Sequence, residues 1–257
     1  MHDQHFLIDP RVVGRIIDYA DIDDDVVLEI GAGAGNLTKA LAAKAAKVFA
    51  IESSGRLAEM ISDLKLPNVD IIHGDALKVD FPEFDKVVSN LPYSISSDIT
   101  FKLLEHDFQL GILMYQHEFA KRMVATANTK DYSRLSICVQ YFADVEILES
   151  VPKTAFRPQP EVKSAIVKIV PRPPTLNVLN KEFFFDFVTA VFTQRRKQMK
   201  NAIINMFQIK SRFVHGSHCD ANEIVNMLPR NMMHKRPGEL SPEELAILSD
   251  MVYEAIS

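Results

Sequence analysis

Three glycines in one turn are the feature of this sequence with the clearest chemical potential. The segment V-V-L-E-I-G-A-G-A-G-N-L-T passes from an apolar run that ends at Ile30 into Gly31, Gly33 and Gly35. Glycines at a strand-to-helix turn let the backbone approach a ligand and adopt conformations that a Cβ disfavours. The dinucleotide-binding pattern, counted from Gly31, needs another glycine where this chain has Asn36, so we expect an adenosine-type ligand rather than NAD.

Two carboxylates follow the glycine turn at positions where strands are expected to end. Glu52 closes the next strand, where a carboxylate can accept both hydroxyl protons of a ribose. Asp75 follows the third strand in I-I-H-G-D-A-L, where it can accept a hydrogen bond from the amine of an adenine. The glycine turn alone would also fit close packing of a strand against a helix. Together with the two carboxylates it predicts an S-adenosyl-methionine site that includes Gly31, Gly33, Glu52 and Asp75.

The turn Asn90-Leu91-Pro92-Tyr93 comes after the fourth expected strand. Asn and Pro are common in turns, so an ordinary loop is one interpretation. The other is the methylation of an aromatic amine, whose lone pair is delocalised into the ring. The Asn90 amide oxygen and the Leu91 carbonyl could hold the N–H groups, Pro92 would stiffen the turn, and Tyr93 would offer a ring face to the base. Positioning, rather than a strong base, would then supply most of the acceleration.

These side chains need a parallel sheet to bring them together. From about Val26 to Val170, apolar runs rich in Val and Ile alternate with helix-like stretches, as in βαβ units. We therefore expect an α/β fold, a Rossmann-like three-layer sandwich with a mostly parallel sheet. The predicted strands are Val26–Ile30, Val48–Ile51, Val69–Ile72, Lys86–Ser89 and Leu110–Tyr115, and the predicted helices between them are Leu37–Ala46, Ser54–Leu64 and Ile99–Leu104.

The later part of the catalytic region predicts an antiparallel edge of the same sheet. Apolar runs at Ile137–Phe142, Val145–Leu148 and Ala165–Val170 are separated by few residues, too few for helical crossovers between all of them. Cys138 lies in the first of these runs and is expected to be a core residue rather than a nucleophile.

A change of composition marks a domain boundary. Three prolines at 171, 173 and 174 predict a stiff linker, so we expect a catalytic domain over residues 1–174 and a small all-helical domain over residues 175–257. Helical periodicity in the second domain is carried by Lys181–Phe192, Lys197–Phe207, Ala221–Leu228 and Pro242–Ile256.

Five separately placed motifs resemble one known family. N-L-P-Y with E-I-G-A-G-A-G is similar to the pattern of amino-methyltransferases, and Q-H-F-L at 4–7, F-R-P-Q-P-E-V at 156–162 and Q-R-R-K-Q at 194–198 narrow the resemblance to the KsgA/Dim family of ribosomal RNA adenine dimethyltransferases. The motifs cover essentially the whole chain in the right order. The resemblance implies a methyltransferase that uses S-adenosyl-methionine and acts on RNA.

The resemblance also implies roles for individual residues. His5 and Leu7 would contact the cofactor from an amino-terminal arm, with Gly31 on its methionine side, and Asn90 would bridge cofactor and target amine. His5 stands where many members have Asn, so its contact is expected to use backbone groups or a tolerant side chain. Phe156 would face Tyr93 across a flipped adenine, although a core Phe that anchors a Pro-rich turn is the alternative.

Charge is segregated along the chain, although its formal net value is only −5 and its sequence pI is about 5.9. Residues 194–212 carry six basic side chains and no acidic one, which favours phosphate contacts over a merely solvated helix face. The RNA-binding residues expected there are Arg195, Arg196, Lys197 and Lys200. Lys153, Arg157, Lys163, Lys168 and Arg172 extend this basic character, whereas five aspartates lie between residues 18 and 25.

Several other kinds of function find no support. His215, His218 and Cys219 form one isolated cluster without a second ligand pair, so we expect no metal site. Two cysteines provide no disulfide framework, and the sequence has no long apolar run or signal-like start, so a soluble cytoplasmic protein without a membrane partner is expected.

The expected function is the dimethylation of N6 on each of two adjacent adenosines near the 3′ end of small-subunit ribosomal RNA. The substrate would be the immature small subunit, and the enzyme would act as a monomer in subunit biogenesis. Two alternatives stay open. One is a methyltransferase for large-subunit RNA or for adenine in DNA, and the other is an assembly checkpoint that mainly binds immature small subunits.

Overall fold

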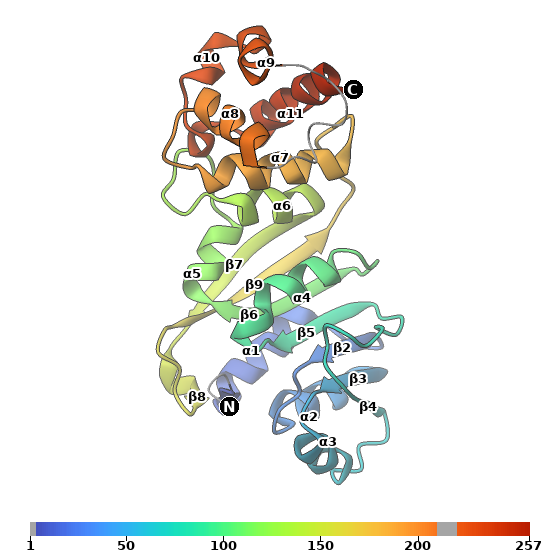
Figure 1. Cartoon of the computed structure of the whole chain (residues 1–257). Coiled ribbons are helices and arrows are strands. Elements are labelled where there is room, and N and C mark those ends of the chain that lie inside the picture. Colours follow the sequence, from blue (N-terminus) through green and yellow to red (C-terminus); the bar gives the residue numbers. More distant parts are fainter. Residues whose placement is uncertain (1–3, 210–219) are drawn as a thin grey trace. The chain divides into compact units, whose positions relative to one another are not determined.

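The computed structural model describes residues 4–209 and 220–257, and its chain divides into two compact units (Figure 1). The first unit contains residues 1–121 and 142–173, and the second contains residues 122–141 and 174–257. The sequence analysis drew one boundary after residue 174, and the contacts divide the chain between Pro173 and Pro174. They also assign Arg122–Tyr141, which we had expected in the catalytic domain, to the second unit.

The first unit is built on a sheet whose strands are ordered β4-β3-β2-β5-β6-β9-β7 among the described residues. The first five of these strands are parallel, whereas β9 runs antiparallel to both β6 and β7. All five predicted parallel strands are present. The strands are β2 (Val26–Ile30), β3 (Lys47–Glu52), β4 (Val69–His73), β5 (Lys86–Asn90), β6 (Leu110–Gln116), β7 (Ala143–Val151) and β9 (Ser164–Pro171), and a separate antiparallel pair joins β1 (Phe6–Leu7) to β8 (Phe156–Arg157).

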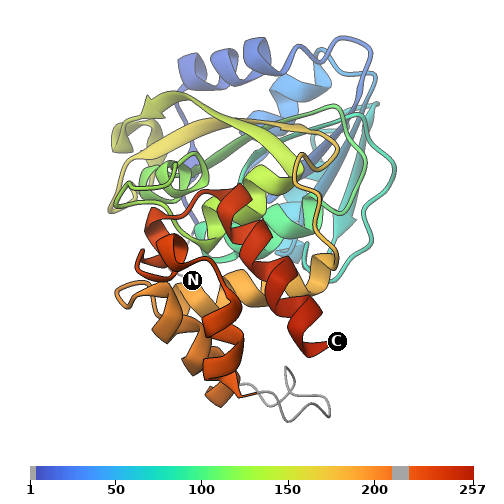
Figure 2. The same ribbon diagram turned by 90° about the horizontal axis from the view of Figure 1, so that it is seen from above.

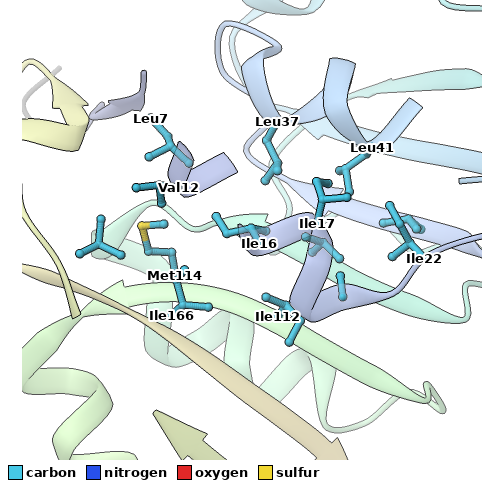
Figure 3. Packing of buried hydrophobic residues seen from close by; sticks show 14 of the residues in the cluster. Leu7, Val12, Ile16, Ile17, Ile22, Leu37, Leu41, Ile112, Met114 and Ile166 are labelled. Atoms are coloured by element: carbon cyan, nitrogen blue, oxygen red, sulfur yellow. The ribbon is translucent and has the colours of Figure 1, made fainter. Parts of the chain in front are cut away.

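One face of the sheet is covered by α1 (Pro10–Ala20) and α2 (Asn36–Ala42). Val12 and Ile16 of α1 pack over Ile112 and Met114 of β6 in one buried apolar cluster, which Leu37 of α2 also joins (Figure 3). The sequence analysis did not predict α1, and it expected α2 to extend to Ala46. The neighbouring helix α3 (Gly55–Ser62) packs on β3 and β4.

The other face is covered as well, which completes the three layers. Side chains alternate along a strand, so Tyr115 points away from the face to which Met114 contributes. The buried Tyr115 hydroxyl lies 2.8 Å from Thr100 Oγ1 of α4 (Ser96–Leu103). The expected α/β three-layer sandwich is therefore confirmed, and β7 and β9 confirm the antiparallel edge.

The predicted strand at Ile137–Phe142 is wrong, because these residues belong to helix α6 (Arg134–Phe142). A short apolar run is consistent with a strand or with a buried helix. Here most side chains around the helix are buried, so no polar face marks its period, and Gln140 Nε2 donates to the carbonyls of Met123 and Ala125. Cys138 is buried as expected, but on a helix, and burial raises the pKa of its thiol to about 12.

The second unit consists of helices in its described part, which confirms the expected helical C-terminal region. Figure 2 shows α11 (Pro242–Ile256) crossing α7 (Lys181–Thr193), and the Phe183 and Tyr253 rings lie 5.2 Å apart between them. The Ser241 hydroxyl and the Glu244 carboxylate form a capping box at the start of α11. The remaining helices are α5 (His117–Met123), which precedes α6 and spans the boundary between the units, and α8 (Met199–Ile209), α9 (Ala221–Met227) and α10 (Arg230–Met233).

Candidate active site

A pocket of about 380 Å³ opens at the carboxyl edge of the parallel strands, within the first unit. Its volume falls in the range of roughly 300–1,000 Å³ that is usual for small-molecule and cofactor sites. Its walls come from the amino-terminal arm at 4–7, the glycine turn after β2, the end of β3 and the turn after β5. The predicted site residues that line it are His5, Leu7, Gly31, Gly33, Glu52, Asn90, Leu91, Pro92 and Tyr93.

The glycine turn is needed for both its backbone conformation and its close contacts. Gly31, Gly33 and Gly35 have φ values of 76°, 59° and 78°, in the left-handed region that favours glycine. A Cβ on Gly31 would lie 3.0 Å from Pro92 Cδ, and one on Gly33 would lie 3.1 Å from a ring carbon of Phe6. The glycines therefore allow the arm and the turn after β5 to close around the same cradle.

Glu52 is held at the end of β3 by backbone donors. Its two carboxylate oxygens accept from Gly33 N and from Ser54 N, each at 2.8 Å, and the residue is buried. Gly31 N and Ala32 N donate to Ile51 O, which fastens the glycine turn to the same strand end. A buried, oriented carboxylate beside a glycine cradle supplies the acceptor that the hydroxyls of an adenosyl ribose require, so the residues present fit S-adenosyl-methionine.

The amino-terminal arm is fixed across the pocket by two asparagine side chains. Asn36 Nδ2 donates to Leu7 O at 2.8 Å, and Asn90 Nδ2 donates to His5 O at 3.1 Å. His5 Nδ1 lies 2.9 Å from Pro158 O, and β1 pairs with β8. His5 thus contacts Asn90 through its backbone. The donation from Asn90 Nδ2 to His5 O fixes which end of the Asn90 amide is the oxygen, and this Oδ1 atom can accept a hydrogen bond.

Tyr93 stands at the pocket wall in a defined orientation. Its hydroxyl lies 2.6 Å from Ser164 Oγ at the start of β9, and its ring centroid lies 5.7 Å from that of His5. The contact at the far end of the side chain fixes the position of the Tyr93 hydroxyl at the pocket wall.

Glu29 is a pocket residue that the sequence analysis missed. Its side chain lines the pocket but is only 2% exposed, and its Oε2 has no hydrogen-bond partner. Burial raises the pKa of Glu29 to about 8, with the Glu52 charge adding to the shift; the Thr38 hydroxyl opposes it without completing a hydrogen bond. A lone carboxylate inside the apolar run V-V-L-E-I is the signal that could have identified this residue.

Two predicted site residues do not line the pocket. Asp75 accepts from Leu77 N at 3.0 Å and lies 3.5 Å from Lys78 Nζ. Phe156 is 2% exposed and packs in the apolar cluster of α1 and the sheet. Neither residue is in the pocket lining of the described arrangement, and their contacts with adenine stay predictions.

The predicted RNA-binding residues in the second unit differ from one another. Arg196 and Lys197 are exposed, and Lys200 is partly exposed at the start of α8. Arg195 instead donates to the backbone carbonyls of Thr129 and Lys130, at 3.1 and 2.7 Å. Arg195 thus ties α7 to the 122–141 segment within the same unit, which is a structural task that its charge alone did not reveal.

Residues 4–209 and 220–257 lack two features. No group of three His, Cys, Asp or Glu side chains there could hold a metal ion, and no helix there is long and apolar enough to span a membrane. The cluster of His215, His218 and Cys219 lies outside the described residues.

The parallel sheet with its glycine cradle and buried ribose-type carboxylate defines the class of Rossmann-like methyltransferases. A family model described as ribosomal RNA adenine dimethylase matches residues 2–236. The chain belongs to this family, whose members use S-adenosyl-methionine as the methyl donor.

Proteins of similar sequence or structure have names that agree with this family. A protein of Methanosarcina mazei called probable ribosomal RNA small subunit methyltransferase A is 54% identical over 98% of this chain and 92% of its own length, and one of Haloarcula marismortui with the same name is 45% identical over 98% and 89%. A dimethyladenosine transferase from Plasmodium falciparum has a TM-score of 0.81, with 32% identity over 95% of this chain and 96% of that one. The 23S rRNA methyltransferase ErmE has a TM-score of 0.68, with 26% identity over 96% and 99%.

Proposed function

We propose that this enzyme transfers two methyl groups to N6 of each of two adjacent adenosines near the 3′ end of small-subunit ribosomal RNA. The observation that carries the proposal is the approach of the Asn90–Tyr93 turn to the glycine cradle, where a Cβ on Gly31 would lie only 3.0 Å from Pro92 Cδ. The groups that we expect to bind the amine and the cofactor therefore line one pocket. The small-subunit assignment is supported by the names of relatives at 44–54% identity.

The cofactor would be held by the residues that line the glycine cradle. Glu52 would accept the ribose hydroxyls, Gly31 and Gly33 would admit the methionine side, and His5 and Leu7 would cover it from the arm. When bound, S-adenosyl-methionine supplies an electrophilic methyl group on a sulfonium. Asp75 would accept a hydrogen bond from the adenine amine, while its Oδ1 also accepts from Leu77 N.

The target amine would be oriented by the turn after β5. Asn90 Oδ1 and the Leu91 carbonyl would accept hydrogen bonds from N6–H, which favours a nitrogen whose lone pair is directed at the methyl group. The Tyr93 ring, anchored at Ser164, would support the adenine by stacking, which is worth roughly 1–3 kcal/mol per base. Phe156 would complete a sandwich only if its ring left the apolar cluster.

The helical unit would contact the RNA backbone through Arg196, Lys197 and Lys200, with Arg195 supporting them from its carbonyl contacts. The partner would be ribosomal RNA within the immature small subunit. The enzyme would act as a cytoplasmic monomer without a metal.

The experiment is the transfer of labelled methyl groups to three substrates: unmethylated small subunits, large subunits and DNA. We expect label in the small subunits, in a pair of adjacent adenosines near the 3′ end of the RNA. Absence of incorporation on small subunits at every stage of assembly would refute the proposal.

A second candidate is the methylation of large-subunit RNA, which the similarity to ErmE over 96% of the chain favours. Incorporation into large subunits alone would support this candidate. The lower identity to ErmE, 26% against 54% to the small-subunit relative from M. mazei, makes it the weaker of the two.

A further inference from the structure

A second pocket, of about 520 Å³, lies at the opposite edge of the sheet, where the parallel strands begin. Its apolar wall is formed by Phe81 and Phe84, whose ring centroids lie 6.5 Å apart, and His106 lies 5.2 Å from Phe81. Val26 at the start of β2 and the 81–85 loop before β5 complete the lining. This aromatic pocket belongs to the first unit and is separated from the cofactor pocket by the length of the strands.

Carboxylates surround the aromatic pocket. Glu83, Asp85 and Asp107 line it, and among its described lining residues there is no Lys or Arg. Glu83 and Asp107 are exposed, whereas Asp85 Oδ2 accepts from Val26 N at 2.8 Å. Two charges at the rim are thus left in solvent beside aromatic rings.

The aspartates after α1 extend this acidic surface, and none of them has a task in the proposed reaction. Lys86 joins them to the pocket, because its ammonium lies 2.8 Å from Asp25 Oδ2 and also donates to the carbonyl of Asp21, while its neighbour Asp85 lines the pocket. Asp23 and Asp24 are exposed on the same loop. The loop after α1 thus adds two exposed carboxylates next to the pocket residue Val26, while Lys86 neutralises Asp25 between them.

The backbone adds negative potential at the same edge, and the ammonium group of Lys102 already lies there. Helices α1 and α4 end there, at Ala20 and Leu103, and helix carboxyl ends attract cations. Lys102 Nζ donates to Ala76 O and Val79 O and lies 4.1 Å from the centroid of the Phe81 ring. One face of the aromatic wall therefore already stabilises a cation.

We propose that this aromatic pocket and its acidic surface dock a lysine- or arginine-rich protein segment, with one basic side chain entering between Phe81 and the carboxylates of Glu83 and Asp107. A guanidinium suits the pocket best, since it stacks on aromatic faces and pairs with carboxylates at the same time. The docking surface is independent of the proposed methyl transfer.

The charge and the size of the acidic surface favour a basic protein segment over nucleic acid and over a small polycation. Nucleic acid would bring phosphates against the carboxylates and is repelled. A small polycation could fill the pocket, but exposed carboxylates lie both at its rim and on the loop after α1. An extended basic segment can contact both parts, as electrostatic complementarity requires.

The test is the binding of a fluorescein-labelled octapeptide of alternating arginine and glycine to the full chain at low salt, measured by anisotropy. The double variant Glu83→Gln/Asp107→Asn should weaken binding roughly tenfold, since it removes two ion pairs. The matched control Glu59→Gln/Asp63→Asn neutralises two exposed carboxylates on and after α3 and changes the net charge equally. It should alter binding less than about twofold. Phe81→Leu should weaken the arginine peptide about threefold by removing the ring face.

Several results would overturn the proposal. An equal loss in the control double variant would assign the binding to bulk charge, and an unaltered affinity in the pocket double variant would exclude the pocket. Spermine binding as tightly per charge as the peptide would assign the surface to small polycations. Thermal unfolding of each variant reports whether it is folded, and methyl transfer to RNA should be unchanged in the pocket double variant, so failure of docking is distinguishable from failure of the proposed reaction.

Discussion

At its carboxyl edge the sheet presents glycines and backbone N–H groups, whereas at its amino edge the same strands present carboxylates and aromatic rings. Strand β5 illustrates the contrast, since Asn90 at its end lines the cofactor pocket and Asp85 just before its start lines the acidic one. At the carboxyl edge even the carboxylate of Glu52 is covered by two backbone donors. At the amino edge Glu83 and Asp107 are exposed.

The difference follows from the direction of the chain. In a βα unit the helix begins near the carboxyl end of its strand and ends near the amino edge, so one edge collects donors and the other collects helix carboxyl ends. Sequence sharpens this polarity, because the glycines lie at the first edge and the aspartates of the loop after α1 lie at the second. Edge position and sequence together therefore distinguish the site that we propose for a nucleoside-type cofactor from the surface that we propose for a basic segment.

The largest expected difference between the edges is in turnover, and two asparagines of the carboxyl edge test its cause. Asn90→Ala should lower kcat by a factor on the order of 10²–10³, as when one transition-state hydrogen-bonding group is removed, with cofactor affinity within a few-fold of the parent. Asn36 also anchors the arm, through Leu7 O, and Asn36→Ala should weaken cofactor binding while leaving kcat nearly intact. Single-turnover methylation and equilibrium dialysis measure the two quantities. Similar kcat losses in both variants would reduce Asn90 to an anchor of the arm.

The next effect is on the pH dependence of protein stability, and it comes from Glu29. Since burial raises the pKa of this carboxyl to about 8, it stays protonated in the folded chain while it ionises in the unfolded chain above about pH 4.5. Below about pH 4.5 the titration of Glu29 costs the folded state no stability. As the pH rises from about 4.5 towards 8, the free energy of unfolding falls because only the unfolded chain ionises. Glu29→Gln does not titrate, so the variant should gain on the parent by a few kcal/mol across this window. Urea unfolding at several pH values measures the gain, and parallel pH profiles for the two proteins would contradict the assignment.

The addition of a methyl group at the glycine cradle should cause a smaller loss of stability and of cofactor affinity. Gly31→Ala places a Cβ at positive φ and 3.0 Å from Pro92 Cδ, so we expect about 1–2 kcal/mol of destabilisation together with weaker cofactor binding. Gly14 in α1 is the matched control, because a Cβ there meets nothing within 4 Å. Gly14→Ala should stabilise the protein by about 0.5–1 kcal/mol. Denaturant titration compares them, and a harmless Gly31→Ala would show that the cradle tolerates a side chain.

The smallest effects concern RNA affinity and its dependence on salt. Arg196→Ala and Lys197→Ala should each lower the slope of log K against log salt by about 1, if each contacts one phosphate. Neutralising the exposed Asp23 and Asp24 with Asn should leave that slope unchanged, because the acidic edge does not face RNA. Fluorescence titration of a labelled small-subunit RNA fragment gives the slopes. A slope that changes only with the aspartate variant would reverse the proposed assignment of the two surfaces.

Much of the fold and pocket could be predicted because local patterns and backbone requirements coincide. The apolar run Val26–Ile30 followed by three glycines predicted a strand that enters a tight turn, and the next strand ends on Glu52 as expected. The parallel strands then bring Asn90 to the same edge. These residues needed only chain order and strand direction.

Other features depend on contacts that no local pattern encodes. Helix α6 is buried around most of its circumference, so its period was hidden. The two carbonyls that accept from Arg195 lie more than sixty residues away in sequence, so no local pattern predicts this contact. Asp75 was predicted from its position after a strand and Phe156 from family resemblance, and neither specifies rotamers or packing. Glu29 was missed because strand interiors are expected to be apolar.

Methylation of two adjacent adenosines is the central claim, and mass-spectrometric mapping of small-subunit RNA tests it most directly. Unmethylated small subunits would be incubated with the enzyme and S-adenosyl-methionine, and the 3′-terminal fragment would be sequenced by its nucleoside masses. We expect N6,N6-dimethyladenosine at two neighbouring positions near the 3′ end, and none with the Asn90→Ala variant over the same time. Unmodified adenosines at these positions, with methyl groups on large-subunit RNA instead, would contradict the account.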